Sequence, residues 1–144
     1  MKVAEKVYVT KCFRFEASHH LINYKGKCSN LHGHSYKLEV TASGNILSFE
    51  DEPLFSPEKC VATDGMVLDF SKIKSLVNEV IIDRYDHSNL NNYFKNPTAE
   101  VMAVEIYSIL NECFLSGYCG RGINLESVKL WETEDSYAEY KGGR

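Results

Sequence analysis

Two stretches of alternating apolar and polar residues constrain the fold of this chain more than any other feature. In residues 7–19 the odd positions carry apolar side chains, with one exception at Lys11, and in residues 32–42 the even positions share one face. Successive side chains of a strand point to opposite faces, so this alternation predicts two half-buried β-strands. The polar, glycine-containing residues 23–27 connect them.

Later segments predict two helices and two more strands. Ser71 can cap a helix that runs to about Arg84, and a second helix starts near Pro97 or Thr98 and ends by Gly117 or Gly120. Residues 66–70 and 125–134 read as strands, whereas residues 44–65 are expected to form an irregular excursion or a loose hairpin. This order favours an α+β fold, in which an antiparallel sheet carries helices on one face.

Length and composition predict one cytoplasmic domain over residues 1–144. No apolar run approaches the roughly 18 residues that cross a membrane, and residues 1–6 lack the pattern of a secretory signal. The five cysteines are an odd number without paired spacing, which suits a reducing compartment. A net charge of −4 with scattered cations argues against nucleic acid. For an anionic substrate, Lys25 and Lys27 are the cations nearest in sequence to the suspected site.

Three histidines form a predicted zinc site. His32 and His34 lie two apart on a strand, so both imidazoles project from one face. The apolar parity of the first strand selects His19 as third ligand over His20, which points to the opposite face. Three imidazoles suit zinc and leave a position for substrate, but Cys28 could instead complete a structural site of one cysteine and three histidines.

Other polar groups suggest acid–base chemistry, each with a structural alternative. Cys28 beside a dication would favour the thiolate, although a cysteine can also be inert. Asp86 and His87 are adjacent and can relay a proton, but such pairs are common at helix C-termini. Glu132 shares a strand face with apolar residues and calls for a partner, unless the strand end leaves it exposed.

The motifs taken together closely resemble the 6-pyruvoyl-tetrahydropterin synthase family, which includes the 6-carboxy-tetrahydropterin synthases. Six blocks occur in the family's order and extend over most of the chain: FEASH at 15–19, CSNLHGH at 28–34, GMVLDF at 65–70, DHSNLN at 86–91, NPTAE at 96–100 and WET at 131–133.

The resemblance implies a tunnelling fold, in which three sheets join into a barrel and two trimers stack as a homohexamer with sites between subunits. It implies that 7,8-dihydroneopterin triphosphate is the substrate. By the family pattern, zinc is held by His19, His32 and His34. Cys28 is the general base, Asp86 and His87 assist proton transfer, and Glu132 anchors the pterin. Thr98 and Glu100 fall near the family's pterin pocket.

The spacing of Cys28 and His32 resembles the carboxy-forming branch of queuosine and 7-deazaguanine biosynthesis. That reaction yields 6-carboxy-5,6,7,8-tetrahydropterin, triphosphate and acetaldehyde. The alternatives are the pyruvoyl-forming enzyme, a non-catalytic protein with a structural zinc site, and a protein that binds a pterin without turnover. Cys28 disfavours the folate-route variant, which has glutamate there. Residues 46–63 are longer than the turn of many bacterial members, and His20 is an extra imidazole.

Overall fold

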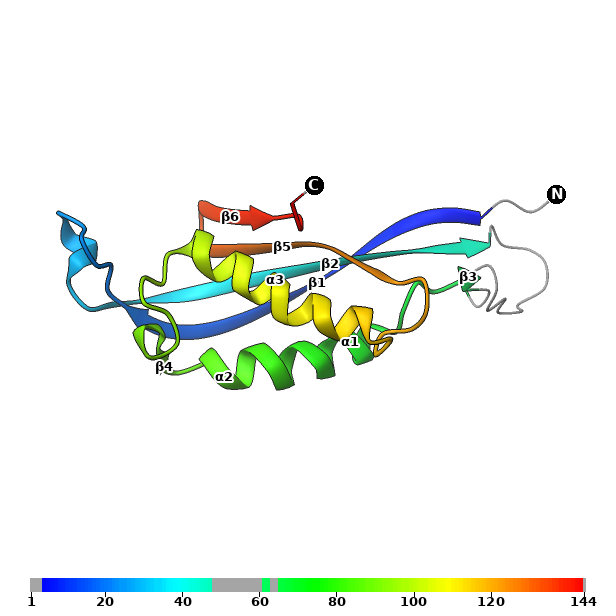
Figure 1. The fold of residues 1–144 in the computed structure, drawn as a ribbon, viewed down its shortest axis with the longest axis horizontal. Helices are drawn as coiled ribbons and strands as arrows, with labels where there is room; N and C mark the ends of the chain where they lie inside the picture. The colour runs from blue at the N-terminus through cyan, green and yellow to red at the C-terminus, as the bar shows by residue number, and fades with distance from the viewer. Residues whose placement is uncertain (1–3, 48–60, 63–64, 144) are drawn as a thin grey trace.

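The computed structural model describes residues 4–47, 61–62 and 65–143, which form one mostly antiparallel sheet with helices over one face (Figure 1). The strands of these described residues follow the order β4-β1-β2-β5-β6, and β3 pairs with β2. Their bounds are β1 (Ala4–His19), β2 (His32–Leu47), β3 (Val61–Ala62), β4 (Ser88–Asn89), β5 (Asn124–Thr133) and β6 (Ser136–Tyr140). The predicted α+β class is confirmed, and four of the strands form its antiparallel part.

The long antiparallel pair β1 and β2 sets which side chains face the core. Ala4 pairs with Leu47 at one end and His19 with His32 at the other. Four residues before His19, Phe15 pairs with Tyr36, and their buried rings stack with centroids 4.9 Å apart. The alternation therefore places one continuous apolar face beneath the helices, and that face ends in the histidines.

Two helical segments cover this face. The first is α1 (Phe70–Val77), a π-helical turn η2 (Asn78–Ile82) and α2 (Asp83–Tyr85), and the second is α3 (Ala99–Leu115). Thr98 caps α3, because its hydroxyl accepts a hydrogen bond from the Val101 N–H at 3.1 Å. The core is closed by apolar side chains of both segments: Ile73, Leu76, Val77, Ile81, Met102, Ile106 and Leu110.

The start of the first helix differs from the prediction. Asp69, and not Ser71, is the N-cap, because its carboxylate accepts the Ser71 N–H at 2.8 Å. The predicted strand at 66–70 is wrong for the same reason: the chain turns into the helix here, while Val67 and Leu68 are buried. The prediction also missed β6, a short edge strand beside β5. Residues 46–63 lie mostly outside the described residues.

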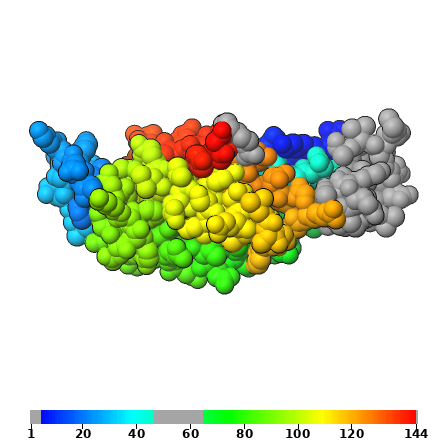
Figure 2. All heavy atoms as spheres, in the orientation of Figure 1, coloured from blue at the N-terminus to red at the C-terminus, as the bar shows by residue number. Residues whose placement is uncertain are grey.

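The molecule is elongated, and one loop extends beyond the helices. Side chains of the helices cover the middle of the face seen in Figure 2, whereas the loop between β1 and β2, in blue, projects at one end. This loop contains η1 (Lys27–Ser29). None of the helices in the described segments is long and apolar enough to cross a membrane.

Candidate metal centre and substrate cavity

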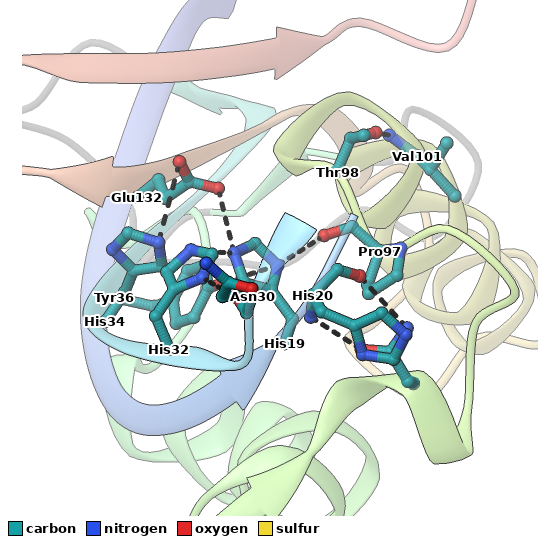
Figure 3. A network of polar contacts seen from close by, with 11 residues as sticks. His19, His20, Asn30, His32, His34, Tyr36, Pro97, Thr98, Val101 and Glu132 are labelled. Carbon is teal, nitrogen blue, oxygen red and sulfur yellow. Dashed lines mark hydrogen bonds and ion pairs between the residues drawn. The ribbon is translucent and has the colours of Figure 1, made fainter. Parts of the chain in front are cut away.

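The register of β1 and β2 brings the three predicted histidines together. His19 pairs with His32, and His34 pairs with Ala17, so all three imidazoles project from the helix-covered face. One ring nitrogen of each histidine lies within 4.8 Å of those of the other two, a grouping that could hold a metal ion. Figure 3 shows the three rings converging beneath Glu132. His20 is outside this group, as its parity predicts.

Backbone carbonyls fix the tautomers of two of these rings. His19 Nδ1 lies 2.7 Å from the Pro97 carbonyl oxygen, and His32 Nδ1 lies 2.7 Å from that of Asn30. Because a carbonyl oxygen only accepts hydrogen bonds, each Nδ1 must carry the proton. In a neutral ring of this tautomer the other nitrogen, Nε2, carries no proton and can serve as a metal ligand.

These nitrogens fit a metal ion. His19 Nε2 and His32 Nε2 are 3.1 Å apart, and with both Nδ1 atoms protonated two lone pairs face each other. Only a shared cation, a metal ion or a proton, makes this contact favourable. Two nitrogens bound tetrahedrally at zinc's usual distance would be roughly 3.3 Å apart. His34 Nε2 is buried and has no hydrogen-bond partner among the described residues, so it is available as third ligand.

Glu132 supplies a negative charge next to this group. Its carboxylate oxygens lie 3.8 Å from His19 Nε2 and 3.8 Å from His34 Nε2. Burial lowers the pKa of His34, while Glu132 opposes this effect and the two other histidines reinforce it. His34 is therefore neutral near pH 7, the form that binds metals.

A cavity of about 740 Å³ adjoins the histidines and contains all three predicted substrate-binding residues. Glu132 and Thr98 line it together with Glu100, and the exposed rings of Tyr24 and Tyr137 stand at its wall. Its volume is that of a typical small-molecule site. Two carboxylates and two aromatic rings suit a flat heterocycle that carries N–H donors.

Cys28 lies outside the histidine group. It is half-buried in η1, and its carbonyl oxygen accepts the Leu21 N–H at 2.8 Å. Among the described residues the grouping of possible ligand atoms contains the three histidines without the Cys28 sulfur. This arrangement favours an open metal site of three histidines over a closed site of one cysteine and three histidines.

Asp86 and His87 occupy the outer edge of β1. The Asp86 carboxylate accepts the Glu16 N–H at 2.9 Å, and this hydrogen bond is the main reason that the pKa of Asp86 is lowered. His87 Nδ1 lies 3.0 Å from the same carboxylate, and its side chain is 79% exposed. Over the described ranges, no hydrogen bond or ion pair joins either residue to Cys28 or to the three histidines. The pair therefore faces outward from this chain.

The sequence did not indicate the groups that orient the histidines. Pro97 and Asn30 act through their carbonyl groups, which carry no side-chain signature. Tyr36 is fully buried, and its hydroxyl lies 3.3 Å from His19 Nδ1. The sequence did offer one signal for Tyr36: the alternation of residues 32–42 places it on the same strand face as His32 and His34.

Comparisons with known proteins identify a family for this chain. The model of the 6-pyruvoyl tetrahydropterin synthase family matches residues 8–143. The chain is 34% identical to a 6-carboxy-5,6,7,8-tetrahydropterin synthase of Haemophilus influenzae, over 92% of this chain and 97% of the relative. It is 33% identical to the Synechocystis protein of the same name, over 92% and 91%.

A solved structure shares the fold as well. The 6-pyruvoyl tetrahydropterin synthase of Caenorhabditis elegans superposes with a TM-score of 0.71 at 27% identity and covers 96% of this chain and 97% of its own. The predicted tunnelling fold is confirmed at the level of the subunit. From the family match and these relatives, the chain belongs to the 6-pyruvoyl tetrahydropterin synthase family.

Proposed function

We propose that this protein is a zinc-dependent lyase of queuosine and 7-deazaguanine biosynthesis. It would convert 7,8-dihydroneopterin triphosphate and one water into 6-carboxy-5,6,7,8-tetrahydropterin, acetaldehyde and triphosphate. The observation that carries the proposal is the 3.1 Å contact between His19 Nε2 and His32 Nε2, beside a His34 Nε2 that has no hydrogen-bond partner among the described residues and a cavity that contains Glu132. The names of the relatives and the spacing of Cys28 and His32 support the carboxy-forming branch.

The pterin ring would bind in the cavity at Glu132. Its carboxylate can accept two hydrogen bonds from the adjacent N–H groups of the ring, and such bidentate pairs fix orientation as well as adding affinity. Thr98 and Glu100 line the same cavity at the N-terminal end of α3 and are the secondary candidates for pterin contacts. The three histidines next to Glu132 then face the side chain of the substrate.

Proton transfer is assigned to Cys28. A zinc ion held by His19, His32 and His34 would polarise the substrate hydroxyls and so lower the barrier to removing the neighbouring C–H proton. Cys28, as thiolate, would accept that proton and later return it. The loop that carries Cys28 is tied to the chain just after β1, because the Leu21 N–H donates to the Cys28 carbonyl oxygen and so holds the Cys28 backbone two residues beyond His19.

The outward position of Asp86 and His87 is explained by assembly. Asp86 holds His87 Nδ1 at 3.0 Å, which orients an exposed imidazole for proton transfer. We propose that this pair completes the site of a neighbouring subunit in a homohexamer of two stacked trimers. A monomer would then bring the three histidines and Glu132 together, and assembly would add the Asp86–His87 pair.

One experiment tests the reaction and separates the alternatives. Purified protein of known zinc content and its Cys28→Ala variant are incubated with 7,8-dihydroneopterin triphosphate, and products are identified by mass spectrometry. We expect carboxy-pterin from the wild type and none from a folded variant that retains zinc. A pyruvoyl product would assign the other branch. Absence of turnover, with zinc lost from Cys28→Ala, would mean a structural zinc site.

A further inference from the structure

The backbone beyond the end of β1 is held by side-chain amides from a distant segment. β1 ends at His19, and the next three N–H groups have no strand partner. The His20 N–H donates to Asn91 Oδ1 at 2.9 Å, and the Ile22 N–H donates to Asn96 Oδ1 at 3.0 Å. The Leu21 N–H between them donates to the Cys28 carbonyl at 2.8 Å.

Asn91 makes a two-point contact that few side chains can make. Besides accepting from the His20 N–H, it donates through Nδ2 to the His20 carbonyl oxygen at 3.0 Å. A side-chain amide thus replaces the pair of hydrogen bonds that a neighbouring strand would supply. Aspartate could keep the first bond and would repel the carbonyl, and alanine would lose both.

Asn91 is itself firmly placed. It belongs to η3 (Leu90–Asn92), where the Asn89 side chain accepts its N–H at 3.0 Å. Leu90, its neighbour, is fully buried in the core and accepts the N–H groups of Tyr93 and Phe94. The amide therefore extends from a rigid turn and can impose its position on the backbone that it contacts.

The contact acts next to two functional groups. His20 directly follows His19, whose ring is oriented by the Pro97 carbonyl of the same distant segment. Leu21, which follows His20, holds the backbone of Cys28. Figure 3 shows the main-chain bonds of His20 beside the histidine group. A shift of His20 would displace the His19 imidazole and the Cys28 thiol relative to each other.

We propose that Asn91 is a positioning residue, which sets the geometry of His19 in the metal centre and its distance from Cys28. The inference rests on the proposed function, because it assumes that the histidines hold a metal. An amide with a merely structural role would affect the free energy of unfolding and leave the metal affinity of the folded protein unchanged. A positioning amide affects that affinity directly.

The test compares Asn91→Asp with Asn92→Asp, a matched change at an exposed neighbour with no contact to residues 19–22 among the described interactions. Zinc affinity is measured by chelator competition, and the absorption spectrum of the cobalt-substituted protein reports ligand geometry. Partners behind metal ligands typically contribute about 10- to 100-fold in affinity. We expect Asn91→Asp to lose zinc affinity by that factor with an altered cobalt spectrum, and Asn92→Asp to match the wild type.

Wild-type affinity and spectrum in folded Asn91→Asp would overturn the inference and leave the proposed function standing. A wild-type protein that binds neither metal would refute the proposed function, and the inference with it. If Asn91→Asp does not fold, Asn91→Ala, which adds no charge, is measured in the same way and decides by the same criterion.

Discussion

Replacing His34 by leucine is expected to stabilise the metal-free protein and to destabilise the zinc-loaded protein, each relative to wild type. His34 Nε2 is buried without a hydrogen-bond partner among the described residues. Such an atom costs about 1–3 kcal/mol. Because 17% of the His34 side chain is exposed, the cost falls near the lower end, about 1 kcal/mol. Leucine has a similar size and no polar atom, so the metal-free variant should be more stable than metal-free wild type by that amount.

Zinc should reverse this order. A metal present at about a hundred times its dissociation constant stabilises the protein that binds it by about 2.7 kcal/mol. The His34→Leu variant keeps two of the three imidazoles, so zinc should add little to its stability. For a chain of this length, 1 kcal/mol changes the unfolding temperature by roughly 3–4 °C. Without metal the variant should unfold about 3 °C above the wild type, and with zinc about 5 °C below it.

Thermal unfolding followed by circular dichroism measures both values, at one fixed protomer concentration, after chelation and again with zinc. His20→Leu is the matched control, because His20 adjoins the site without belonging to it, and it should retain the zinc-dependent increase. The reasoning would be refuted if His34→Leu were less stable than wild type without metal, or if it kept the full increase with zinc.

Three further outcomes are expected. Glu132→Gln should weaken pterin binding about 10- to 100-fold in a fluorescence titration, since hydrogen bonds to a charged group contribute about 1.5–3 kcal/mol. Burial lowers the pKa of His34, so the unfolded chain binds more protons than the metal-free protein below the ordinary histidine pKa of about 6.5. Stability in urea should therefore fall as pH drops through that value, and fall less in His34→Leu. Phe15→Ala, which removes a fully buried stacked ring, should cost about 3–5 kcal/mol in the same urea assay, and a loss below about 1 kcal/mol would contradict the packing described.

The histidine group that could hold a metal could be predicted from sequence because strand geometry leaves little freedom. A period of two decides which face each side chain occupies, so parity alone separates His19 from His20 and groups His32 with His34. The antiparallel register then has to bring the ends of the two strands together, as the pairing of His19 with His32 confirms. Of the cavity residues, Glu132 was singled out by the apolar strand face that it shares, whereas Thr98 and Glu100 followed from the family's motifs.

Elements were harder to predict where neighbouring residues favour different secondary structures. The apolar run at 66–70 has the composition of a strand, but Asp69 caps the following helix and draws these residues into a turn. The residues that orient His19 and His20 could not be predicted either. Asn91 and Pro97 contact backbone or ring atoms more than 70 positions away in the chain. Such contacts depend on tertiary packing, so a local sequence pattern does not predict them.

The length of the β1–β2 ribbon has a practical consequence for labelling. Ala4 pairs with Leu47 at one end and His19 with His32 at the other, and fifteen steps of about 3.3 Å separate the two ends. Within one subunit, a fluorophore attached at Ala4 would be roughly 50 Å from the histidines. This separation is near the working range of resonance energy transfer, so a dye at this end and a second one in the loop that carries Cys28 could report movements of that loop.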